Sequence, residues 1–252
     1  MKALSGITLL LWIACAQAAT PPRSAESTFA MRAFVTDGKC APSRLTQCVT
    51  GRLRKGQEIF LLDHRQSAVC RSRALDSFMS GFQASDDFAL TQVDTAACPG
   101  MAFNVAVAAP AQPAYRLITA AEIAPRDIAA KIDAAVRAGY RKITPASTEH
   151  PSQLSPKAPD IFRLPAQHAG AYIAVYQNEK IPGDQTHVLY ANGQLKLIHP
   201  SANIRSIFML DKRAFIHYTF DCKIGCGWRG DIIIEFSGED FHTLMFDDSG
   251  SA

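Results

Sequence analysis

The chain has 252 residues, of which 48% are hydrophobic and 19% charged, and its formal net charge is +3. Such an apolar content is typical of a globular protein with a packed core. The small net charge argues against nucleic acid as a partner and against a strong attraction to anionic membranes. The length suits one large domain or two small ones.

The first 18 residues have the pattern of a secretory signal peptide. Lys2 precedes a short apolar run, and residues 16–18 (Ala-Gln-Ala) form a small-x-small cleavage site. The apolar run is shorter than the roughly 20 residues that cross a bilayer, so we expect no transmembrane segment in the mature chain. We expect cleavage after Ala18. The alternative is a lipid anchor on Cys15, although Trp12 stands where the lipoprotein pattern prefers leucine.

After a polar tether, the first half of the chain consists of short apolar runs separated by turn signals. The expected strands are Thr28–Val35, Glu58–Leu62, Ala68–Leu75, Phe88–Val93, Met101–Ala109 and Tyr115–Ile118. In Met101–Ala109, large apolar residues alternate with alanine and asparagine. This period of two predicts that one face of the strand is buried and the other only lightly filled.

One helix and a proline-rich segment follow. Pro125 suits a first helical position, and apolar residues recur every four positions from Ile128 to Val136. Gly139 stands where a left-handed C-terminal cap belongs, so we expect the helix to end there. Residues 143–160 contain four prolines and no apolar period, which predicts a linker or a long surface loop.

The second half has the pattern of an antiparallel meander. The expected strands are Ala171–Tyr176, His187–Ala191, Leu195–His199, Ile204–Leu210, Ala214–Phe220, Asp231–Phe236 and Phe241–Phe246. From Phe29 to Lys142, 15 basic residues face 10 acidic ones, a net charge of +5, whereas residues 161–252 carry 8 and 10, a net charge of −2. We therefore expect an α+β protein, predominantly antiparallel β. Its two modules would be residues 28–142, with the helix, and residues 161–252.

Six cysteines follow the leader, and an even number in an exported chain predicts disulfides. They are Cys40, Cys48, Cys70, Cys98, Cys222 and Cys226. If the halves fold separately, the last two pair with each other and the first four have three possible connectivities. We favour Cys40–Cys48 and Cys70–Cys98.

Two chemical alternatives involve the second half. Cys222 and Cys226 could hold a metal ion together with His217 and His242, but the exported compartment favours a disulfide. A hydrolytic set of His217, Asp221 and a nearby serine or cysteine is conceivable, yet the chain contains none of the common catalytic or cofactor-binding motifs. An enzyme is therefore the less favoured interpretation, and we expect no cofactor.

The sharpest binding hypothesis concerns Trp228 and Arg229, which follow the cysteine pair after one glycine. These residue types are enriched in interface hot spots, and a disulfide-closed loop would lose little entropy on binding. The alternative is that Trp228 belongs to the core and Arg229 is simply solvated.

A group of basic residues offers a second surface, which could meet an anionic envelope polymer or an acidic protein. It consists of Arg52, Arg54, Lys55, Arg65, Arg71 and Arg73. The alternative is a solvated sheet face balanced by Glu58, Asp63 and Asp76. The sequence thus favours a periplasmic or secreted binding protein for a protein or an envelope polymer. A secreted hydrolase is the second candidate.

Overall fold

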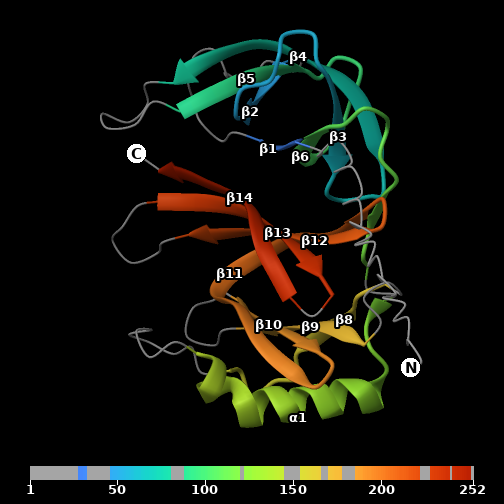
Figure 1. Ribbon diagram of the computed structural model, residues 1–252, viewed down its shortest axis with the longest axis vertical. Coiled ribbons are helices and arrows are strands. Elements are labelled where there is room, and N and C mark those ends of the chain that lie inside the picture. Colours follow the sequence, from blue (N-terminus) through green and yellow to red (C-terminus); the bar gives the residue numbers. More distant parts are fainter. Residues whose placement is uncertain are drawn as a thin grey trace, which may run out of the picture.

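The computed structural model describes the chain from residue 28 to residue 250, with gaps (Figure 1). The described residues are 28–32, 46–80, 88–119, 122–144, 154–165, 170–177, 185–221, 228–238 and 240–250. They form two antiparallel sheets and one α-helix, which confirms the predicted class. The predicted signal peptide lies outside them. In the described part of the chain, no helix is both long and apolar enough to cross a membrane.

The first sheet contains six strands in the order β1-β6-β3-β4-β5-β2. They are β1 (Thr28–Met31), β2 (Thr46–Thr50), β3 (Glu58–Asp63), β4 (Val69–Ser80), β5 (Phe88–Asp94) and β6 (Phe103–Ala108). The two outer strands approach each other, because Arg32 directly after β1 forms an isolated bridge with Val49 of β2. The sheet therefore nearly closes around its own apolar cluster, which includes Leu61 and Phe103.

The second sheet is the predicted meander, with the order β14-β13-β12-β11-β10-β9-β8 and β7 paired to β11. Its strands are β7 (Tyr115–Leu117), β8 (Asp160–Arg163), β9 (Ala171–Gln177), β10 (Gln185–Ala191), β11 (Gln194–Leu210), β12 (Arg213–Asp221), β13 (Trp228–Ser237) and β14 (Asp240–Gly250). Asn192 and Gly193, both with positive φ, form the turn between β10 and β11, as the Asn-Gly signal predicted.

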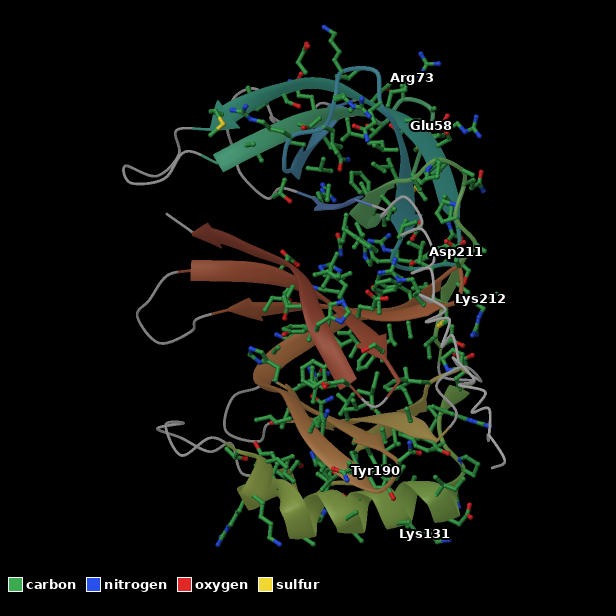
Figure 2. The ribbon with its side chains drawn as sticks, viewed as in Figure 1. Glu58, Arg73, Lys131, Tyr190, Asp211 and Lys212 are labelled. Carbon is green, nitrogen blue, oxygen red and sulfur yellow. A yellow bond between two sulfur atoms is a disulfide. The ribbon has the colours of Figure 1, made fainter. Side chains whose placement is uncertain are left out.

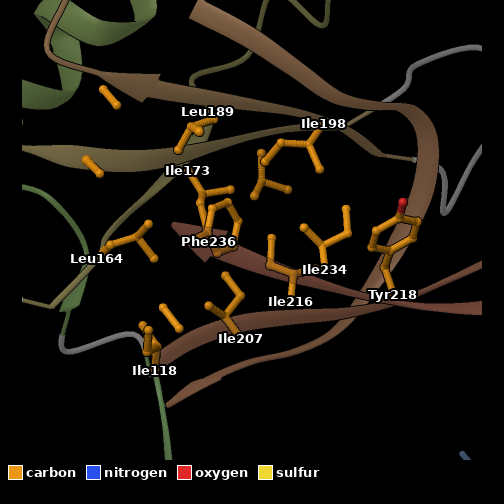
Figure 3. Close-up of a cluster of buried hydrophobic side chains, with 14 of the residues drawn as sticks. Ile118, Leu164, Ile173, Leu189, Ile198, Ile207, Ile216, Tyr218, Ile234 and Phe236 are labelled. Carbon is orange, nitrogen blue, oxygen red and sulfur yellow. The ribbon is translucent and has the colours of Figure 1, made fainter. Parts of the chain in front are cut away.

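The expected strands Leu195–His199 and Ile204–Leu210 are one strand, β11, and the prediction of a break between them was wrong. The first part of β11 pairs with β10 and its second part pairs with β12. Irregularities in both pairings let the strand change partner without leaving the sheet. The second sheet can therefore fold over, and Ile173 and Leu189 face Ile216 and Ile234 across a shared core (Figure 3).

The molecule is a stack of layers, with the first sheet above β11–β14, then β8–β10, then the helix (Figure 1). Between the first sheet and β11–β13 lies an apolar seam, in which Leu62, Val105 and Val107 meet Phe208 and Phe215. All residues of β6 are buried, because one face of this strand lies in the first sheet's interior and the other in the seam. The expectation of a lightly filled second face on this strand was therefore wrong.

Helix α1 (Arg126–Ile143) begins directly after Pro125, as predicted, but it passes through Gly139 and is capped at Thr144. A Cβ atom at position 139 would lie 2.6 Å from Cδ1 of Leu195 in β11. The glycine therefore permits close packing and does not end the helix.

The charge pattern groups α1 with residues 28–142, yet the helix packs on the second sheet. Ile132, Val136 and Tyr140 share a cluster with residues of β8, β9 and β10, and Tyr190 of β10 lies against the helix (Figure 2). Leu154, from the described end of the predicted linker, joins the same cluster. The apolar face of the helix thus has its partner in the second half of the chain.

Candidate ligand-binding cavity

A cavity of about 590 Å³ opens on the interior side of the first sheet, beside the loop that joins β5 to β6. This volume falls within the range of small-molecule sites, about 300–1,000 Å³. Its apolar wall includes Leu61, Met101 and Phe103, and its polar groups come from Arg32, Gln47, Arg65 and Thr95. The cavity therefore combines apolar walls with a few convergent polar groups, as ligand sites commonly do.

The β5–β6 loop that borders the cavity is held at several points. The Asp94 carboxylate accepts a hydrogen bond from the Ala96 amide (2.9 Å), and the Cys98 amide donates to the Thr95 carbonyl (3.0 Å). Gly100 supplies a positive φ of 73°, which suits a residue without Cβ. Cys98 also forms a disulfide with Cys70 of β4, the pairing that the sequence analysis favoured. The loop is therefore a fixed wall of the cavity.

Two buried polar atoms of the cavity lining have no hydrogen-bond partner. Thr95 is only 6% exposed, and its Oγ1 makes no hydrogen bond. The Oε1 atom of Gln47, on β2, is also buried and makes no hydrogen bond. Nearly all buried polar atoms in proteins are satisfied by protein or by ordered water, so a group left without a partner calls for an explanation. Here both atoms belong to residues that line one cavity.

Two guanidinium groups give the cavity its charge. Arg32 is half-buried, with its guanidinium carbon 5.9 Å from the centre of the Phe103 ring, and burial lowers its pKa. Arg65 is exposed at the rim. The described residues of the lining include neither aspartate nor glutamate.

The nearest buried carboxylate, Asp63, is turned to the backbone. It is 2% exposed and accepts hydrogen bonds from the amides of Arg65 (2.8 Å) and Ala102 (3.3 Å) and from the side chain of Gln66 (3.3 Å). Burial raises the pKa of Asp63, but these hydrogen bonds outweigh it, and the pKa lies below its usual value. Asp63 therefore stays ionised and fixes the chain around Arg65 and Ala102, which line the cavity.

A second polar cluster lies in the seam between the sheets. Nε2 of His217 on β12 is 2.8 Å from Oδ1 of Asp231 on β13, and the two side chains are 1% and 2% exposed. The other polar atom of each, Nδ1 and Oδ2, has no partner, and neither has Oγ1 of Thr219, which faces Asp231 across the strands. His217 therefore pairs with Asp231, not with Asp221 as the sequence suggested. Sealed from solvent in this way, the pair cannot reach a substrate.

Several of the predicted site residues fall partly or wholly outside the described residues. Trp228 and Arg229 begin β13, where their backbones pair with Gly250 and Ser249 of β14, but their side chains are not described. Cys40, Cys222 and Cys226 lie outside the described residues. Cys48 is disulfide-bonded, and its partner is not among the described residues.

The metal set that the sequence offered as an alternative to a disulfide can be placed only through its two histidines, whereas the whole basic group is described. Nε2 of His242 on β14 lies 3.2 Å from Oε2 of Glu235, whereas His217 pairs with the buried Asp231. Among the described residues, no group of three or more His, Cys, Asp and Glu could hold a metal ion. In the basic group, Lys55 pairs with Asp76 and Arg71 with Glu58. Glu58 and Arg73 are also neighbours across β3 and β4 (Figure 2). These two ion pairs fit the solvated alternative, but Asp63 binds the backbone and Arg65 lines the cavity.

Of the residues that line the cavity, the sequence pointed to Arg65, in the basic group, and to the disulfide cysteine Cys98, but not to Arg32, Gln47 or Thr95. They lie far apart in the chain and form no motif. The one local signal was the Cys98-Pro99-Gly100 turn, which predicts a loop but does not show that a cavity lies beside it. No protein-family model, no curated protein and no solved structure matches this chain.

Proposed function

We propose that this chain is an exported, disulfide-stabilised binding protein whose ligand site is the cavity beside the β5–β6 loop. The observation that carries the proposal is the Thr95 hydroxyl, which is buried in the cavity wall without a hydrogen bond. A buried polar group without a partner costs about 1–3 kcal/mol. A ligand that bonds to Thr95 removes this cost, which favours the bound state. The leader and the even number of cysteines after it support export.

Binding fits the cavity better than hydrolysis does. Among the described residues that line it there is no histidine, aspartate or glutamate, so this part of the lining offers none of the usual general acids and bases. The hydrolytic set that the sequence suggested includes His217, and this side chain is buried in its pair with Asp231. An envelope polymer suits a cavity better than a flat protein surface does, because a side group of the polymer can enter it.

The cavity is tested by NMR titration of the isotope-labelled mature chain, residues 19–252, with soluble fragments of envelope glycan. We expect shifts at residues 95–103 and at the side-chain amide of Gln47. Thr95→Val keeps the shape but removes the hydroxyl, so it should weaken binding without loss of stability. The matched control Thr243→Val lies on the exposed part of β14 and should bind as the parent does. Absence of shifts at the cavity, or equal binding by Thr95→Val, contradicts the proposal.

Export is tested separately by expression of the full chain with its leader. We expect a protein that begins at Ala19 and is found in the periplasm or the medium, with no free thiol detectable before reduction. An intact leader on a protein that remains in the cytoplasm contradicts this part of the proposal. A lipid attached at Cys15 would support the alternative anchor.

A further inference from the structure

We infer that the cavity binds the acetamido group of an N-acetylated amino sugar. This inference rests on the proposed function and adds the chemical class of the ligand. It is drawn from the strand register beside the cavity, from the two lining atoms without hydrogen-bond partners and from the apolar wall. An acetamido group matches all three, because it combines one donor, one acceptor and one methyl group.

The register of β2 and β5 brings Gln47 and Thr95 close together. Gln47 is paired with Val93, and Thr95 directly follows β5, two positions after Val93. Val93 belongs to the apolar cluster inside the first sheet, and both Gln47 and Thr95 line the cavity. Diagonal neighbours on one face of an antiparallel pair lie about 7–8 Å apart. One small group in the cavity can therefore contact both side chains.

The two polar atoms without partners need a donor and an acceptor side by side. Oε1 of Gln47 only accepts hydrogen bonds, whereas the Thr95 hydroxyl can donate one. The N–H of an acetamido group donates to Gln47, and its carbonyl oxygen accepts from Thr95. In a trans amide these two groups point in opposite directions, so they reach partners on two neighbouring strands. A carboxylate offers acceptors only and would leave Gln47 Oε1 unsatisfied.

The apolar wall favours an acetamido group over a hydroxyl group alone. Leu61 and Phe103 belong to the cluster inside the first sheet, Met101 packs against it, and all three residues line the cavity. A hydroxyl group also supplies a donor and an acceptor, but it covers none of this wall. The acetyl methyl group removes part of the wall from water, which favours binding. The flexible thioether of Met101 can adapt to its shape.

The test compares N,N′-diacetylchitobiose with cellobiose, which has a hydroxyl group in place of each acetamido group. Both disaccharides are uncharged and share the same linkage. Binding to the mature, disulfide-bonded chain is measured by calorimetry, and we expect cellobiose to bind at least tenfold more weakly. In NMR spectra of the complex, the acetyl methyl protons should give NOEs to the methyl group of Met101. Binding of the acetylated sugar without these NOEs contradicts the inference.

Variants assign the two hydrogen bonds. Gln47→Met keeps the approximate shape but removes the amide acceptor, and Thr95→Val removes the hydroxyl group. Each should weaken binding of diacetylchitobiose at least fivefold and change the binding of cellobiose less. Gln194→Met is the matched control, because Gln194 is exposed at the start of β11, and this variant should bind as the parent does.

The outcomes separate the inference from the proposed function. Equal binding of the two disaccharides, together with shifts at residues 95–103, overturns the acetamido inference and leaves the binding function standing. Binding of a peptide that contains acetyl-lysine, in place of diacetylchitobiose, overturns it as well, because the acetamido group then comes from a protein. If neither the disaccharides nor the envelope glycan fragments shift residues 95–103, both the inference and the proposed function fail.

Discussion

His187 should make the stability of this protein sensitive to mild acid. The side chain is fully buried on β10, inside the folded second sheet, where its ring lies 6.0 Å from that of Tyr218. Its Nε2 lies 3.3 Å from Oε1 of Gln185, and its Nδ1 has no partner. Protonation would place a charge and a second N–H group where no acceptor receives them. Burial, with a smaller contribution from His199, lowers the pKa of His187 to about 3.

The direction of the effect follows from the two pKa values. In the unfolded chain the pKa of histidine is about 6.5, so as the pH falls the unfolded state binds the proton first. The stabilising contribution of neutral His187 is therefore complete above about pH 6.5 and is lost progressively as the pH falls toward 3. With a pKa of about 3 in the folded state, the free energy of unfolding falls by about 2 kcal/mol between pH 7 and pH 5.

Urea unfolding of the mature chain at pH 7, 6 and 5 measures this loss. His187→Gln removes the titrating group. From pH 7 to pH 5, the variant should therefore lose about 2 kcal/mol less of its free energy of unfolding than the parent loses. The control His242→Gln changes a half-exposed histidine of β14 and should keep the parent's dependence. If His187→Gln loses stability with pH as steeply as the parent does, the reasoning is refuted.

The other predictions concern the disulfide, the seam and the Trp228 loop. Cys70→Ser with Cys98→Ser should lower the free energy of unfolding by about 3 kcal/mol in urea titrations, because the bond closes a long loop between positions 28 apart. His217→Leu alone leaves the Asp231 carboxylate buried without its partner and should cost about 3–5 kcal/mol. His217→Leu with Asp231→Leu should be more stable than that single variant, and a less stable double variant would contradict the role of the pair. Trp228→Ala tests the loop hypothesis by pull-down from an envelope extract. Loss of partner capture by a folded variant supports it, and unfolding of the variant contradicts it.

Strands with strong alternation and clear turn signals could be predicted from the sequence, whereas those defined by distant partners could not. β10 and the start of β11 flank Asn192 and Gly193, so local chemistry predicts their hairpin. β2 (Thr46–Thr50) mixes polar and apolar residues and was missed, because it is held by pairing with residues of β5 that lie 40 to 48 positions later in the chain. β8 (Asp160–Arg163) was missed because it directly follows the proline-rich segment and depends on β9. From local sequence alone, Gly139 predicts the end of a helix. In the structure it lies within the helix, where the absence of a Cβ atom lets Leu195 pack closely.

The cavity was beyond prediction for a related reason. Arg32 follows β1, Gln47 lies on β2, Arg65 follows β3 and Thr95 follows β5. Only the strand order of the nearly closed sheet brings these four positions together. Composition and spacing identified Arg65 as one of several surface cations, but they carry no information on which hydroxyl or amide is left without a partner.

The charge split suggested two independent modules, but the contacts between the sheets make the cavity a property of the whole chain. The Tyr115 hydroxyl, on β7 of the second sheet, donates to the carbonyl of Asp63 (2.7 Å), whose carboxylate holds the backbone around Arg65 and Ala102. The rings of Phe29 and Phe215 meet across the seam with their centres 5.2 Å apart. Removal of the second half would expose this seam, which includes Leu62 of β3 and Val105 of β6, and these two strands also carry the cavity residues Leu61 and Phe103. The meander therefore supports the strands beside the cavity as well as forming its own core.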